Sequence, residues 1–431
     1  MKSEVRLQKL WLFSGSVFLL LLLVPIQVSF AKYNFELTPG ISVGETYDDN
    51  IYLGSTNEKS DYITSVSPSL NLNILSEKNS LALRYAPTFV WYDDESQNDT
   101  VRHSGALTFA QDLTEHLRFD LTNTYLKSEE PIEETEEVEG VRTTRNPYQR
   151  NTGEARLRYL FGPENTLIAG YRHSMLENED VTIDDGTIQN PFCTVTYWLN
   201  VKNGLELDYE FTDAEFSRDD GSVPGDDYTG HGAGMRYLYR LTPHSTASLG
   251  YHYTNRDFDG QTEDYNVHDG SIGLEQAFSP DLSVSLGAGY FAVENERSDD
   301  ESGLTYEASL IKRFARGSFA IGGSGGWDEA YLEAERRGLT RYWRGNTRLE
   351  YRILEPLSGY AGGLYRQDKS DLDNREWKTL RGTCGLEWGF HRWFSFSLDY
   401  AYSQRDDDVD VDDYKANRVM LILTGSRLFQ W

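Results

Sequence analysis

Two runs of carboxylates are the residues whose type and spacing most readily suggest chemistry. Seven glutamates fall between Glu129 and Glu139, and six aspartates fall between Asp406 and Asp413. Because Ca²⁺ and Mg²⁺ bind several carboxylate oxygens at once, each run is a candidate cation site. The alternative is a solvated acidic loop that repels anions, and this is the interpretation that we favour.

Within the second run, Asp408, Asp410 and Asp412 have the spacing with which an EF-hand loop begins. The rest of that motif is missing, because Asp413 stands where the turn glycine belongs and Val419 where the bidentate glutamate belongs. These aspartates are therefore weak metal candidates. We expect no dedicated cofactor, although loosely bound Ca²⁺ or Mg²⁺ could bridge the acidic loops to lipopolysaccharide.

A second set of charged residues lies at alternate positions inside segments that otherwise alternate apolar and polar. Side chains two residues apart on a strand share one face, and charges of both signs can pair across neighbouring strands. The sequence leaves two interpretations open: a wet lumen that guides a polar solute, or a lumen closed by ion pairs. The lumen candidates are Arg84, Arg118, Asp120, Arg156, Arg158, Glu206, Asp208, Glu210, Arg348, Glu350, Arg352, Arg381, Glu387 and Asp399.

Catalytic groups are harder to find. His231, His252 and His268 fall on consecutive predicted strands, but only His252 has the polar parity, so the three cannot converge. The glycine-rich stretch 322–326 lacks the Lys-Ser/Thr of a phosphate-binding loop and lies within a strand pattern. No nucleophile elbow or metal-spaced His/Cys cluster is present. We therefore predict that the protein is not an enzyme.

The elements that position these residues are long two-sided strands. Segments of roughly eleven to fourteen residues alternate in character, as where Leu205, Leu207 and Tyr209 interleave with Glu206 and Asp208. Soluble strands usually have about five or six residues, whereas a tilted membrane strand needs about nine to eleven. The pattern therefore favours a transmembrane barrel over a soluble sandwich.

The connections alternate between short and long, which is typical of the periplasmic turns and external loops of outer-membrane barrels. Nine short and ten long connections predict an all-β, antiparallel, up-and-down barrel of about 20 strands, within a range of about 18 to 22. Aromatic residues crowd the predicted strand ends and are expected in the interfacial girdles. They are Trp91, Tyr92, Tyr125, Tyr148, Tyr228, Tyr265, Tyr331, Tyr342, Trp343, Trp377, Tyr402 and Tyr414.

The two ends of the chain carry targeting signals. Lys2, Arg6 and Lys9 precede an apolar run, and Ser29-Phe30-Ala31 has small residues at the positions expected before a cleavage site. We expect residues 1–31 to be a cleaved signal peptide and 32–431 to form the barrel. The chain stops on Phe429-Gln430-Trp431 after an amphipathic strand, so Phe429 and Trp431 are candidates for the signal read by the barrel assembly machinery.

Composition narrows the partners. The net charge of −28 argues against nucleic acid, whose phosphates require a basic surface. Cys193 and Cys384 lie on distant predicted strands with outward parity, so we expect no disulfide. These features predict a protein in the outer membrane of a Gram-negative bacterium, with both termini in the periplasm and with membrane lipid and lipopolysaccharide as neighbours.

The opening strand and loop, Thr38 to Val43 followed by Tyr47-Asp48-Asp49-Asn50-Ile51, resemble the start of the putative β-barrel porin-2 family. The hairpin from Gly153 to Tyr171 also follows that family's pattern, although such hairpins are common among barrels. Members are often associated with loci for exopolysaccharide synthesis and export. The resemblance therefore implies a pore for a surface polysaccharide, supplied by periplasmic export proteins.

Two further functions remain open from the residues themselves. One is a diffusion porin, general or selective, for a small polar solute. The other is a structural surface protein whose acidic loops hold polysaccharide or divalent cations.

Overall fold

The computed structural model describes residues 33–133, 142, 145–218, 226–330, 338–370, 375–409 and 412–431. Within these ranges the chain is almost entirely β-strand, with one short 3₁₀ turn at Ser96–Asn98. The described residues include no helix that is both long and apolar enough to cross a membrane. The expected signal peptide, residues 1–31, lies outside the described residues.

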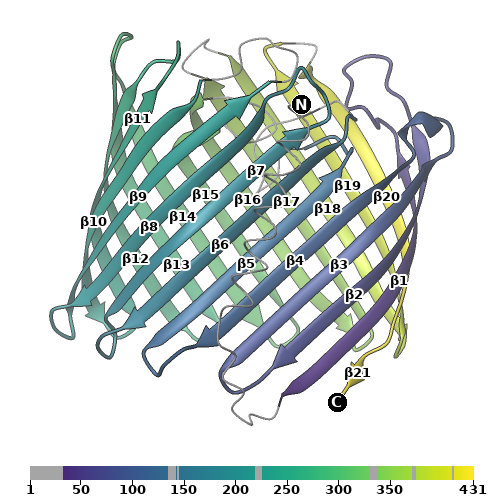
Figure 1. Ribbon diagram of the computed structural model, residues 1–431, viewed down its shortest axis with the longest axis horizontal. Coiled ribbons are helices and arrows are strands. Elements are labelled where there is room, and N and C mark those ends of the chain that lie inside the picture. The colour runs from purple at the N-terminus through teal and green to yellow at the C-terminus, as the bar shows by residue number, and fades with distance from the viewer. Residues whose placement is uncertain are drawn as a thin grey trace, which may run out of the picture.

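Twenty long antiparallel strands and one short terminal strand form a single sheet (Figure 1). Each long strand pairs with its neighbour in sequence, and the first pairs with the twentieth, so the sheet closes into a barrel. This confirms the predicted architecture. The strands are β1 (Asn34–Asp48), β2 (Asp61–Leu75), β3 (Asn79–Tyr92), β4 (Thr100–Asp112), β5 (Leu117–Ser128), β6 (Tyr148–Leu160), β7 (Thr166–Asn178), β8 (Asp185–Trp198), β9 (Asn203–Ser217), β10 (Tyr228–Thr242), β11 (Ser245–Phe258), β12 (Tyr265–Ser279), β13 (Leu282–Asn295), β14 (Glu301–Phe314), β15 (Gly317–Ala330), β16 (Gly338–Leu354), β17 (Leu357–Ser370), β18 (Glu376–His391), β19 (Phe394–Asp407), β20 (Tyr414–Ser426) and β21 (Phe429–Gln430).

The seam of the barrel joins the first strand to the last. β1 pairs with β20 from Gly40 to Asp48, and the short β21 continues this pairing after a break at Arg427 and Leu428. Phe35 and Trp431 exchange two backbone hydrogen bonds, of 3.0 and 3.1 Å, and their rings stack at 6.2 Å. The start of β1 and the C-terminus therefore lie side by side, at the end of the barrel where the short turns are (Figure 1).

Local polar side chains close the short turns. The Thr114 hydroxyl accepts hydrogen bonds from the backbone N–H groups of His116 and Leu117, at 3.1 and 2.9 Å. Asn200 does the same for Lys202 and Asn203, at 2.9 and 3.0 Å. Side-chain caps of this kind replace the backbone bonds that a turn lacks. The short connections therefore follow from sequence.

The two faces of the sheet differ as the alternation predicted. On β9, Leu207 and Tyr209 are 43% and 47% exposed on the outer face, while Glu206 and Asp208 point inward. Cys193 on β8 and Cys384 on β18 are free cysteines with outward parity. An apolar outer face and a polar inner face are what a membrane barrel requires.

Strand number sets the width of the interior. Barrels of about 16–18 strands leave an aqueous channel, and barrels of about 22 strands leave a lumen that needs a plug. A ring of twenty strands lies between these classes, so side chains alone do not fill it. The interior can therefore be narrowed only by loops or strand ends that fold inward from the barrel wall.

Several strand-end aromatics are not in the girdle, which corrects the sequence-based expectation. Six of them have inward parity and are almost completely buried at the long-loop end. Trp91 and Trp343 do face outward, at 45% and 42% exposure. Tyr331 lies outside the described residues. The six inward aromatics are Tyr92, Tyr148, Tyr228, Tyr265, Trp377 and Tyr414.

Candidate functional site

The loop between β1 and β2 folds into the barrel and packs on its inner wall. Ile51 is 0% exposed and packs with Val90 and Tyr92 of β3, while Leu53 is 1% exposed and packs with Tyr414 of β20. Two apolar side chains thus attach one loop to walls on both sides of the seam. Burying such side chains stabilises each contact by about 1.5–3 kcal/mol.

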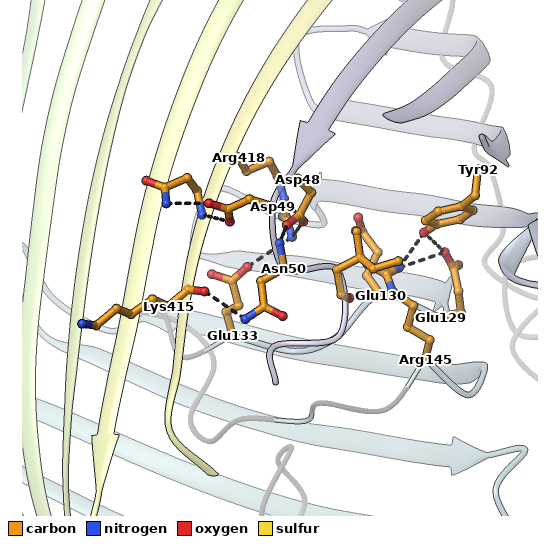
Figure 2. Close-up of polar contacts among 12 residues, drawn as sticks. Asp48, Asp49, Asn50, Tyr92, Glu129, Glu130, Glu133, Arg145, Lys415 and Arg418 are labelled. Atoms are coloured by element: carbon orange, nitrogen blue, oxygen red, sulfur yellow. Dashed lines mark hydrogen bonds and ion pairs between the residues drawn. The ribbon is translucent and has the colours of Figure 1, made fainter. Parts of the chain in front are cut away.

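Asn50 holds the sharp bend that makes this possible. Its amide Nδ2 donates to the carbonyl oxygen of Lys415 at 2.9 Å (Figure 2). The same Nδ2 donates to the carbonyl oxygen of Gly54 at 2.9 Å, and Oδ1 accepts from the Gly54 N–H at 2.9 Å. Its own backbone N–H donates to Asp48 Oδ1 at 3.0 Å. Leu53 has a φ of 48°, a left-handed conformation that is costly for a leucine. The packing of Leu53 against β20 offsets that cost.

The loop between β5 and β6 lies against the first. Glu129 is 3% exposed, and its carboxylate binds Arg102 of β4 at 2.6 Å and lies 3.8 Å from Arg145. Arg145 in turn donates to the carbonyl oxygen of Ile51 at 2.7 Å and to the Tyr92 hydroxyl at 2.5 Å (Figure 2). The two loops are therefore joined by buried, charge-assisted hydrogen bonds.

Glu133 extends this contact across the interior to strands beyond the seam. Its carboxylate lies 2.9 Å from Arg381 of β18 and 3.3 Å from Arg418 of β20. Arg418 also binds Asp48 of β1 at 2.9 Å (Figure 2). One acidic side chain thus connects the β5–β6 loop to the opposite side of the seam. We call residues 49–59, 129–133, 142 and 145 the mouth segments.

The charges of the mouth segments support one another. Burial raises the pKa of Glu130, but the nearby guanidinium groups of Arg102, Arg418 and Arg145 lower it by more, so its pKa lies below the ordinary value of 4.5. Glu130 binds Arg102 at 2.9 Å. Glu130 is therefore an ionised partner of arginine. The expectation of a solvated loop is wrong for Glu129 and Glu133, and Glu134, Glu136, Glu137 and Glu139 lie outside the described residues.

A second inward contact comes from the end of the β15–β16 hairpin. Glu329 binds Arg256 of β11 at 2.7 Å and accepts a hydrogen bond of 2.7 Å from the Tyr265 hydroxyl. Asp328 lies 3.2 Å from Arg366 of β17. Trp327 and Leu339 pack on a cluster of buried apolar side chains from β9 to β13. The long-loop end is thus narrowed from two sides.

The fourteen predicted lumen residues all have the inward parity of their strands. They do not form one continuous ladder, because most pair locally. Arg118 binds Asp120 at 2.8 Å, and Arg348 binds Glu350 at 2.8 Å. Glu206 binds Arg236 at 2.6 Å. These partners leave charged groups of both signs exposed along the wall. Among the contacts of the described residues, Arg381 is the one of the fourteen that reaches a mouth segment.

The remaining predicted sites stay apart. Asp399 accepts a hydrogen bond of 2.7 Å from Tyr360, and His252 lies 3.4 Å from Asp208, whereas His231 and His268 bond to outward-facing tyrosines. Asp412 binds Arg375 at 2.5 Å, and Asp410 lies outside the described residues. Across the described ranges, no group of three or more His, Cys, Asp or Glu residues is arranged to hold a metal.

The sequence analysis did not predict Arg418 and Arg145, which lie close to the glutamates of the mouth segments. Arg418 has the polar parity of its strand, so extending the parity argument to β20 would have found it. Arg145 lies between strands, where parity carries no information. Its role becomes visible only when the two loops are seen in contact.

Comparison with known proteins agrees with this architecture. The model of the family described as Putative beta-barrel porin 2 matches residues 34–163, which confirms the resemblance over β1 to β6 and their loops. No curated protein matches the sequence.

Solved barrels resemble the chain in fold. The siderophore receptor PirA from Pseudomonas aeruginosa has a TM-score of 0.51 at 12% identity, covering 91% of this chain and 80% of that one. The ferric enterobactin receptor PfeA of the same organism, in complex with BCV-L6, has a TM-score of 0.51 at 10% identity, covering 91% and 81%. These identities show a common fold only, that of outer-membrane barrels.

Proposed function

We propose that this protein is a non-enzymatic outer-membrane pore for a hydrated polar solute, with a mouth that its own loops narrow. In the proposed orientation, the short turns and both ends of the barrel face the periplasm, and the mouth segments face outward. Carboxylates and arginines along the wall would replace part of the solute's hydration shell. Contacts of this kind must be weak and numerous, because tight binding would stall passage.

The observation that carries this proposal is the combination of a wide ring with inward-folded mouth segments. A closed ring of twenty strands exceeds what side chains fill. The link from Glu133 to Arg381 and Arg418 narrows the path on one side of the interior. The geometry therefore favours restricted passage over an unselective hole.

Conductance of the purified protein in planar lipid bilayers tests the proposal. We expect ion-conducting steps in the wild type and larger steps in Glu133→Gln, because the neutral side chain loses its charge attraction to both arginines. Glu350→Gln is the matched control, since Glu350 is an exposed lumen carboxylate that pairs only with Arg348 among the contacts described. The absence of conductance in all three proteins would contradict a pore.

Polysaccharide export is a second candidate, and one feature of the wall favours it. The inward residues of β13 include Ser283, Ser285, Gly287 and Gly289, which form a smooth polar strip. A long chain that slides through a pore needs such a strip more than a small solute does. The family resemblance points the same way.

Deletion of the gene separates the two candidates. Polysaccharide should be measured separately on the cell surface, in the medium and in the periplasm. Accumulation in the periplasm with loss from the surface, reversed by complementation, would support export. Unchanged amounts in all three fractions would leave the small-solute pore as the better account.

A further inference from the structure

A small cavity opens on the inner wall near the short turns, far from the mouth segments. It has a volume of about 180 Å³ and is lined by side chains of β8, β10, β11 and β12. An apolar cavity of about 150 Å³ holds a molecule the size of benzene. This cavity therefore has room for one ring of a small molecule.

One side of the cavity is a fixed aromatic–cation stack. The Arg240 guanidinium lies 3.6 Å from the centre of the Trp198 ring. Arg240 is held there by Glu164, at 2.8 Å, and by the carbonyl oxygen of Val201, at 3.3 Å. The ring packs on Gly204, where an added Cβ would lie 3.0 Å from the indole. The stack is thus held in place from both sides before any ligand arrives.

The other lining residues present polar groups around an apolar patch. Leu238 is 9% exposed and supplies the patch. Thr246 and Ser248 contribute hydroxyl groups, which can donate or accept, and Arg236 contributes donors only. Glu275 is exposed to the lumen and has no hydrogen-bond or ion-pair partner among the described residues. Its carboxylate is therefore free to accept hydrogen bonds from a ligand.

The charge around the cavity selects among ligands. Arg236 is already neutralised by Glu206, at 2.6 Å, and Arg240 by Glu164, at 2.8 Å. Glu275 then leaves a local negative charge without a counterion. An anionic ligand would place like charges together, which costs binding energy. An uncharged ring with several hydroxyl groups meets no such cost.

We propose that this cavity is a binding subsite for one ring of an uncharged carbohydrate on its way through the lumen. The apolar face of the ring would lie against Leu238 and the edge of the stack, and its hydroxyl groups would bond Glu275, Arg236 and the two hydroxyl residues. This inference rests on the proposed pore function and names the class of solute. A single shallow site of this kind gives the weak binding that passage requires.

Binding can be measured without relying on conductance. The probes are maltotriose as the neutral sugar and glucuronate as the anionic one, added to protein in detergent while tryptophan fluorescence is recorded. We expect maltotriose to change the emission of the wild type and not that of Trp198→Phe. Glucuronate should have little effect. Equal responses to both sugars, or none to maltotriose, would overturn the proposal.

Conductance in the presence of sugar supplies the second readout. Maltotriose should reduce the ion current of the wild type, and Glu275→Gln should weaken this block about tenfold, because a charge-assisted hydrogen bond is lost. Glu307→Gln is the same change on the inner face of β14, outside the cavity, and maltotriose should block this variant as strongly as the wild type. Equal block in all three would overturn the subsite and leave the pore intact. Sugar-dependent fluorescence without any conductance would instead contradict the pore alone.

Discussion

Some arginine side chains at the long-loop end of this barrel form ion pairs that are almost completely buried. Arg366 is 1% exposed, and its guanidinium binds Asp368, which is 0% exposed, at 2.7 Å. Its guanidinium also lies 4.7 Å from the ring centre of Tyr342. Arg366 also lies 3.2 Å from Asp328, so loss of Asp368 weakens the pairing of a buried charge, which costs more than the loss of an exposed pair. Ion pairs of the same residue types therefore contribute different amounts to the free energy of unfolding, depending on whether they are buried or exposed.

A matched pair of substitutions measures this difference. Asp368→Asn should lower the free energy of unfolding by about 1.5–3 kcal/mol, because buried Arg366 loses its charged partner at 2.7 Å and keeps the longer contact with Asp328. Glu350→Gln should lower it by less than about 1 kcal/mol, since its pair with Arg348 is exposed. Urea unfolding followed by tryptophan fluorescence gives both values. Similar midpoints for the two variants would contradict the argument.

At the scale of the element, the mouth segments act as one unit because each is attached to the wall and to the other. The β1–β2 loop is anchored by apolar packing at Ile51 and Leu53, and the β5–β6 loop by ion pairs at Glu129 and Glu133. Apolar anchors do not depend on pH, whereas the ion pairs do. Acid should therefore release the second loop before the first.

Acid should enlarge the mouth. The pKa of Glu130 is lower in the folded protein than its ordinary value of 4.5, so its stabilising contribution is complete above about pH 4.5 and disappears as pH falls through the folded pKa. Single-channel conductance should stay constant from neutral pH down to about pH 4.5 and rise reversibly as the pH is lowered further.

The variant Glu130→Gln supplies the control for the acid effect. It should already conduct more at pH 6 and should respond less to acid. A wild-type conductance that stays constant or falls on acidification would show that the loop is held by its apolar contacts instead.

A matched substitution tests the apolar anchor. Leu53→Ser removes the side chain that packs on Tyr414 and Ala416 and should cost about 2–4 kcal/mol, as other truncations of buried leucines do. The β1–β2 loop should then become accessible to added protease at neutral pH. Val409→Ser, at a 41% exposed position in another long loop, is the control and should not alter cleavage between β1 and β2.

At the scale of the whole molecule, the barrel exists only because the seam closes. β20 and β21 pair with β1 over most of its length, and the last residue exchanges hydrogen bonds with Phe35. An open edge within a bilayer would leave unpaired N–H and C=O groups, each costing several kcal/mol. The contacts of β21 and Trp431 with β1 therefore stabilise the closed barrel.

Truncation of the terminal aromatic should impair closure. Trp431→Ala loses the stacking with Phe35, which contributes about 0.5–1.5 kcal/mol beyond simple burial. The ratio of folded to unfolded barrel, recorded as heat-modifiable mobility on SDS gels, should fall severalfold during refolding into lipid, as this free-energy range implies. Leu428→Ala is the control, since Leu428 lies in the break between β20 and β21 and is 54% exposed. Equal refolding of both variants would argue against a role for the terminal ring.

The sequence by itself determined the strands, their number, the short turns and the face on which each wall residue lies. These follow from local physics: side chains alternate along a strand with a period of two, and turns are closed by neighbouring residues such as Thr114. Only the tertiary structure decided where the long loops go and which strand-end aromatics turn inward. Ile51, Glu133 and Arg145 find partners on strands far away in sequence, and such contacts have no local periodicity from which to read them. The cavity beside Trp198 belongs to the same class, because four strands must be in register before its lining residues meet.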